Sequence, residues 1–116
     1  IWVVDGTDAK VYVYDMNGGF VSQFGLFGKN KNASGITTNG TNIWVVDAGT
    51  DKVFKYTMSG KNKGGFTLAS GNNNAQGITT DGVNFWVVDW GDDTIYKYDM
   101  SGGFISSFSQ IGRAHV

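Results

Sequence analysis

The chain has 116 residues, of which 41% are hydrophobic and 15% aromatic, so it holds one domain at most and is too apolar for a disordered chain. Its net charge of −1 gives no electrostatic basis for binding nucleic acid or an anionic membrane, and no apolar run is long enough to span a bilayer. Cysteine is absent, which excludes disulfides and thiolate metal sites.

The first predicted elements are three short strands rich in β-branched and aromatic residues, joined by turns of Gly, Asp and Asn. A loop rich in Gly, Asn and Lys follows over residues 25–34, and two further sets of strands come after it. No segment has a helical pattern. The predicted strands are 1–5, 10–14, 20–24, 35–38, 43–47, 52–56, 65–69, 77–80, 85–89, 94–98 and 103–108.

One strand motif, Ile/Phe-Trp-Val-Val-Asp, begins at residues 1, 43 and 85, so its copies are 42 residues apart. A fixed period of this length is typical of repeat architectures. The motif is apolar on both faces, which indicates a strand covered by other layers above and below. Its three tryptophans and three aspartates are predicted structural residues of the repeat: Trp2, Trp44, Trp86, Asp5, Asp47 and Asp89.

Four antiparallel strands in 42 residues describe one blade of a β-propeller, with strands A to D. The predicted fold is therefore all-β, with about two and three-quarter blades: residues 1–34 without strand A, 35–76, and 77–110. Up-and-down connection places the B–C and D–A loops on one face of the disc and the A–B and C–D loops on the other.

The C–D turn of the middle unit is predicted to be longer than the other two. Phe66 lies 23 residues after Ile43, whereas Phe20 and Phe104 lie 19 residues after the corresponding strand starts. If these three phenylalanines are equivalent, residues 59–64 contain an insertion. Variable loops on constant strands are typical of a rigid scaffold.

The segment 44–56, together with Gly60 and Phe66, resembles the NHL repeat, in which a strand ending in Asp is followed by a small-Gly turn, a V-x-x-[FY] strand and a Gly turn. The resemblance covers residues 1–108. It fails at the name-giving Asn-His-Leu positions, and the YVTN-type repeat is a near neighbour. The resemblance implies a bacterial β-propeller, commonly six-bladed, that serves mostly as an interaction platform, although some relatives are lyases or other enzymes.

Residues 111–116 match no repeat position. They resemble the translation of a sequencing-adapter oligonucleotide; the alternative is a linker toward a further blade. The first interpretation, with no strand A before Ile1, predicts a fragment of a longer protein.

The candidate chemistry is sparse. The single histidine, His115, lies in that tail, so no catalytic residue, metal ligand or cofactor site is predicted in this segment. A ring of Asp5, Asp47 and Asp89 binding Ca²⁺ was weighed against a structural role, in which each carboxylate accepts hydrogen bonds from its own B–C turn. The structural role is preferred, because a residue repeated in every unit usually serves the unit.

Trp90 differs from its counterparts, Gly6 and Ala48. With Asp92 and Asp93 beside it in a B–C turn, it is the predicted ligand-binding residue, suited to stack on a sugar or a peptide side chain. The alternative is packing onto the neighbouring D–A loop.

These features predict a scaffold that binds a protein, peptide or carbohydrate on the face of the B–C and D–A loops, with no nucleic-acid or membrane partner. One alternative is a propeller lyase or hydrolase with its catalytic residues in other blades. Another is a structural module of a large extracellular, periplasmic or cell-surface protein. Self-association is also expected, because uncapped apolar residues are predicted on both end faces: Trp2, Val4, Tyr12 and Phe20 on one, and Trp86, Tyr96 and Phe104 on the other.

Overall fold

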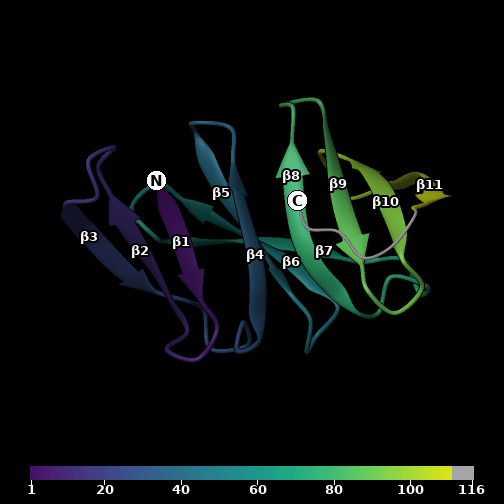
Figure 1. Ribbon diagram of the computed structural model, residues 1–116, viewed down its shortest axis with the longest axis horizontal. Helices are drawn as coiled ribbons and strands as arrows, with labels where there is room; N and C mark the ends of the chain where they lie inside the picture. The colour runs from purple at the N-terminus through teal and green to yellow at the C-terminus, as the bar shows by residue number, and fades with distance from the viewer. Residues whose placement is uncertain (111–116) are drawn as a thin grey trace.

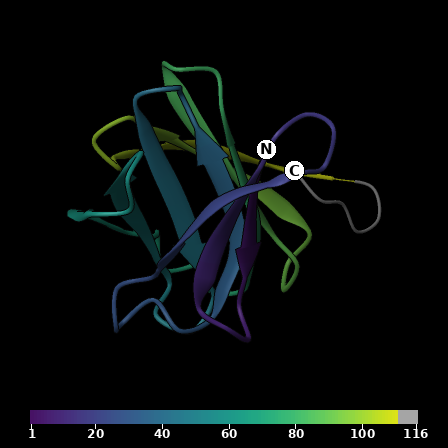
Figure 2. The same cartoon turned by 90° about the vertical axis from the view of Figure 1, so that its left-hand side faces the viewer.

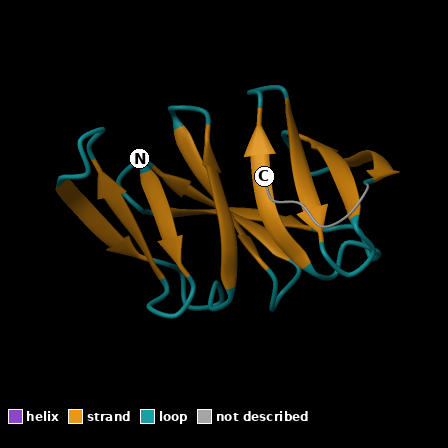
Figure 3. Cartoon of the chain, viewed as in Figure 1, coloured by secondary structure: helices purple, strands orange, loops and turns teal. Residues whose placement is uncertain are grey.

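The computed structural model describes residues 1–110, which form strands and their connections (Figures 1 and 3). No helix in this range could cross a membrane. The tail at 111–116 and its predicted origin lie outside the described residues. The strands are β1 (Trp2–Asp5), β2 (Lys10–Tyr14), β3 (Phe20–Gly25), β4 (Ala33–Thr38), β5 (Asn42–Asp47), β6 (Lys52–Thr57), β7 (Asn62–Thr67), β8 (Ala75–Thr80), β9 (Asn84–Asp89), β10 (Thr94–Asp99) and β11 (Phe104–Ser109).

The strands form three antiparallel sheets in chain order: β1-β2-β3, β4-β5-β6-β7 and β8-β9-β10-β11. We call them the first, middle and third blades. They follow one another along the long axis of Figure 1, and Figure 2, which looks along that axis, shows them one behind another. The predicted architecture of about two and three-quarter propeller blades is confirmed.

The predicted insertion in the middle blade is wrong. Phe66 pairs with Val53 on strand C, as Phe24 pairs with Val11 and Phe108 with Ile95. These three phenylalanines are 42 residues apart, so the period holds through strand D. The C–D turns also match, because the residue that closes each turn, Gly19, Lys61 or Gly103, accepts an equivalent backbone hydrogen bond.

Two apolar clusters lie between the blades, one on each side of the middle sheet. Ile43 and Val45 of β5 point toward the first blade, and Trp44 and Val46 point toward the third. All four are buried, so the strand is covered on both faces as predicted. The alternation along β5 follows from the two-residue period of a strand.

The same alternation corrects the predicted end faces. Trp2 and Val4 pack against the cluster shared with the middle blade, and Tyr96 lies in the cluster between the middle and third blades. The outer side of the first blade instead carries Ile1 and Val3, which are 49% and 44% exposed.

Candidate functional site: the face of the B–C and D–A loops

The B–C turns (6–9, 48–51 and 90–93) lie beside the D–A loops (26–32 and 68–74), along the lower edge of Figure 1. Backbone hydrogen bonds join them: the Ala48 N–H donates to the Asn32 carbonyl, and the Trp90 N–H donates to the Asn74 carbonyl, both at 3.1 Å. The two sets of loops form one surface, which we call the loop face.

Each B–C turn is built around the aspartate that ends strand B. The Asp47 carboxylate is fully buried and accepts hydrogen bonds from the Asn32 N–H at 2.6 Å and from the Thr50 N–H at 2.9 Å. The Thr50 hydroxyl donates a third at 2.7 Å. The aspartate therefore holds its own turn and the preceding D–A loop together.

Asp89 repeats this arrangement, accepting hydrogen bonds from the Asn74 N–H at 3.0 Å and the Gly91 N–H at 2.7 Å. Asp5 accepts only from its own turn, at Thr7 and Asp8. No group of three His, Cys, Asp or Glu residues within 1–110 could hold a metal ion.

The three predicted ligand-binding residues lie together in the third B–C turn. Trp90 is partly buried, and its backbone joins the D–A loop. The Asp92 carboxylate accepts a hydrogen bond from the Tyr96 hydroxyl at 2.7 Å. Burial, followed by this hydrogen bond, raises the pKa of Tyr96 far above its ordinary value, so the tyrosine remains a donor at neutral pH.

Asp93 adopts a left-handed backbone conformation with φ of 51°, as do its repeat counterparts Ala9 and Asp51. Its Oδ1 atom is buried without a hydrogen-bond partner in the described part of the chain. The side chain is therefore only partly directed to solvent, and Trp90 and Asp92 are the better placed of the three candidates.

A pair of contacts between blades was missed from the sequence. The Tyr56 hydroxyl of the middle blade accepts hydrogen bonds from the Phe27 N–H at 2.9 Å and from Asn30 Nδ2 at 3.0 Å. Asn30 is fully buried in the D–A loop. The signal available was periodic: asparagine at 30 and 72, followed 26 residues later by tyrosine.

Charge is divided unevenly among the repeats. Residues 26–67 hold six lysines and two aspartates, a formal charge of +4, whereas residues 68–109 hold one lysine and five aspartates, a formal charge of −4. The net charge of −1 conceals this division. The loop face of the third blade therefore lies in an acidic unit next to a basic one.

The chain matches no protein-family model and no curated protein. Its structure is similar to virginiamycin B lyase from Staphylococcus aureus, with a TM-score of 0.71 and 18% identity over 97% of this chain and 38% of that one. Glutaminyl cyclase from Myxococcus xanthus has a TM-score of 0.71 and 10% identity over 93% and 45% of the two chains. BamB from Moraxella catarrhalis has a TM-score of 0.57 and 20% identity over 96% and 34%.

The chain thus spans less than half the length of each of these proteins. At such identities the likeness concerns the fold alone. Together with the three sheets, it identifies the chain as a segment of a β-propeller.

Proposed function

We propose that this segment is a binding scaffold of an NHL-like or YVTN-like propeller, and that the loop face of the third blade takes a cationic segment of a protein or peptide. The supporting observation is the placement of a partly exposed Trp90 beside Asp92 in a unit with a formal charge of −4. Lysine and arginine side chains interact favourably with both an indole face and a carboxylate. The first and middle blades have Gly6 and Ala48 in place of the tryptophan.

A propeller enzyme is the second candidate, supported by the lyase and the cyclase among the similar structures. In that case the catalytic groups are expected on blades beyond this segment, because its described residues contain no histidine for general acid–base chemistry.

The binding proposal is tested by titrating the chain with tetra-arginine and with tetra-glutamate in a calorimeter. We expect saturable binding of tetra-arginine alone. Trp90→Ala should weaken it by about 2- to 5-fold, the range of an exposed cation–π contact. Asp92→Asn should also weaken it, whereas Asp81→Asn, which removes the same charge from an A–B turn on the opposite face, should not. Equal binding of both peptides, or equal effects of the two asparagine variants, would contradict the proposal.

A further inference from the structure

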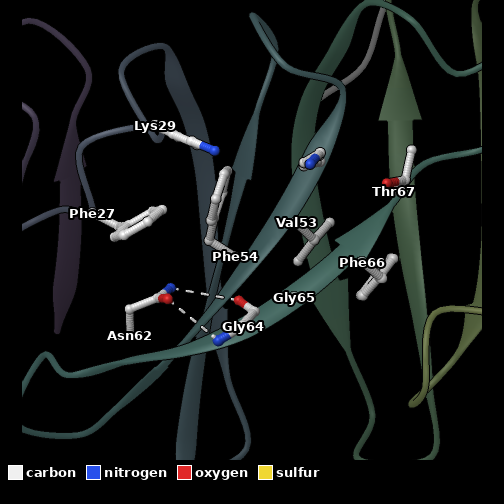
Figure 4. Close-up of a pocket in the computed structure, with 10 residues that line it drawn as sticks. Phe27, Lys29, Val53, Phe54, Asn62, Gly64, Gly65, Phe66 and Thr67 are labelled. Atoms are coloured by element: carbon white, nitrogen blue, oxygen red, sulfur yellow. Dashed lines mark hydrogen bonds between the residues drawn. The ribbon is translucent and has the colours of Figure 1, made fainter.

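A pocket of about 250 Å³ opens at the outer part of the middle blade, where β6 and β7 meet the D–A loop from the first blade (Figure 4). Phe54 of β6, only 7% exposed, lies among its lining residues together with Phe27 of the loop, which is 44% exposed. The two ring centroids are 6.1 Å apart. The pocket is therefore partly lined by aromatic surface that solvent reaches.

The residues that leave this space open occur only in the middle blade. Asn62 pairs with Tyr56 at the position that Phe20 and Phe104 occupy in the other blades. In the third blade the Phe104 ring packs on two tyrosines, with centroids 6.1 and 6.0 Å from them. Asn62 has no ring to place over the equivalent residues, Phe54 and Tyr56.

Two glycines widen the opening. Gly65 pairs with Phe54, whereas Gln23 and Ser107 hold this position in the first and third blades. Gly64 and Gly65 both have positive φ, and a Cβ at Gly65 would collide with the Val53 carbonyl oxygen. The strand therefore follows a path that requires glycine, and no side chain covers the ring of Phe54 from this position.

The polar groups around the pocket select for negative charge. Lys29 and Lys52 are its only charged lining residues, and they belong to the repeat with a formal charge of +4. Figure 4 shows Lys29 on the side of Phe54 opposite Asn62. The Asn62 amide makes long hydrogen bonds of 3.4 and 3.5 Å to the backbone of Gly64, which a ligand can replace at little cost.

The volume limits the size of the ligand. An apolar cavity of about 150 Å³ accommodates benzene, so about 250 Å³ accommodates one aromatic ring and a short polar arm. We propose that this pocket binds a small aromatic carboxylate, with its ring against Phe27 and Phe54 and its acid group between the lysines and the Asn62 amide. The proposal is independent of the cationic ligand of the loop face.

The test is an NMR titration of the ¹⁵N-labelled chain with phenylacetate. Two partial analogues are titrated in parallel: 2-phenylethanol, which keeps the ring without the charge, and acetate, which keeps the charge without the ring. We expect saturable shifts at Asn62, Gly64 and Gly65 with phenylacetate, and affinity at least about 2- to 5-fold lower for each analogue. The absence of saturable shifts with phenylacetate, or equal affinity for 2-phenylethanol, would overturn the proposal.

Variants separate the pocket from nonspecific binding. Asn62→Phe restores the residue found in the neighbouring blades and should abolish binding while the chain remains folded by circular dichroism. Lys52→Gln should weaken binding by about 2- to 5-fold, whereas Lys10→Gln, the same change at the same repeat position in the first blade, should not. If Asn62→Phe fails to fold, the two lysine variants decide, and equal effects from them would also overturn the proposal.

Discussion

The Tyr98 hydroxyl accepts a hydrogen bond from Asn72 Nδ2 at 3.0 Å across the interface between the middle and third blades. It also accepts one from the Ala69 N–H at 2.9 Å. Tyr56 and Asn30 make the same contact at the preceding interface. Because each tyrosine satisfies donors of a loop from the neighbouring blade, the contact couples the stacking of the blades to the shape of the loop face.

Removing that hydroxyl should destabilise the chain. Tyr98→Phe leaves the Asn72 amide and the Ala69 N–H unpaired in a buried site, and we expect a loss of about 1–3 kcal/mol in urea unfolding. Tyr14→Phe is the matched control. Its hydroxyl has no hydrogen bond among residues 1–110, so its effect should stay within about 0.5 kcal/mol. Similar losses from the two variants would show that the hydrogen bonds between blades do not stabilise the stack.

These tyrosines also predict a limit on stability at high pH. Burial raises the pKa of Tyr56 and Tyr98 above the ordinary value of 10.0. Above about pH 10 the unfolded chain loses protons that the folded chain retains, so the free energy of unfolding falls as pH rises. Below that pH these groups make no difference to the slope.

Chemical denaturation between pH 8 and pH 11.5 measures this effect. Tyr98→Phe should make the decline above pH 10 shallower, because one of the contributing groups is removed. A stability that stays constant through this range would contradict the assignment.

The turn aspartates should contribute to stability without calcium. Asp47→Ala removes the acceptor of three hydrogen bonds, and we expect a loss of about 1–3 kcal/mol. Asp5→Ala should cost less, because Asp5 accepts no hydrogen bond from a D–A loop among the described residues. Thermal unfolding with and without Ca²⁺ provides the check. A rise of several degrees with Ca²⁺ that Asp47→Ala abolishes would mean that the carboxylate binds metal.

The exposed ends of the stack suggest self-association. Phe24 and Phe66 each pack on a tyrosine of the next blade, with centroids 5.8 and 5.6 Å apart, but their counterpart Phe108 is 54% exposed. We propose that the outer face of the third blade docks on that of the first blade of another copy, giving a dimer that approximates six blades or larger species.

Light scattering at tens of micromolar should therefore give a mass above that of one chain. Phe108→Ser should lower it, and Val83→Ser should not, because Val83 is 67% exposed in an A–B turn away from the end faces. A folded monomer of the unaltered chain would contradict the docking of these faces.

The sequence was sufficient to predict the blades but not the register of strand D. All eleven strands were predicted near their observed positions, because each combines β-branched and aromatic residues with flanking glycine or asparagine turns. Phe66 follows two glycines, as Phe20 follows Gly18 and Gly19, and this local identity concealed its equivalence with Phe24. Pairing with strand C, a contact remote in sequence, sets the register instead.

The functional surfaces were predictable only in part. Trp90 could be found because it departs from Gly6 and Ala48 at the same repeat position. The pocket could not, because it depends on the absence of a ring at Asn62, and that absence becomes visible only when strand D is aligned by pairing. The buried contact of Asn30 with Tyr56 likewise joins two blades, and the pattern of a single strand does not reveal it.

The central claim is that the loop face of the third blade is a binding surface for cationic segments. Mapping NMR chemical-shift changes in the ¹⁵N-labelled chain during a titration with tetra-arginine tests it most directly. The account predicts that the changes concentrate in residues 68–74 and 90–93 and are lost in Trp90→Ala. Changes confined to the A–B and C–D turns on the opposite face, or no saturable change at all, would contradict it.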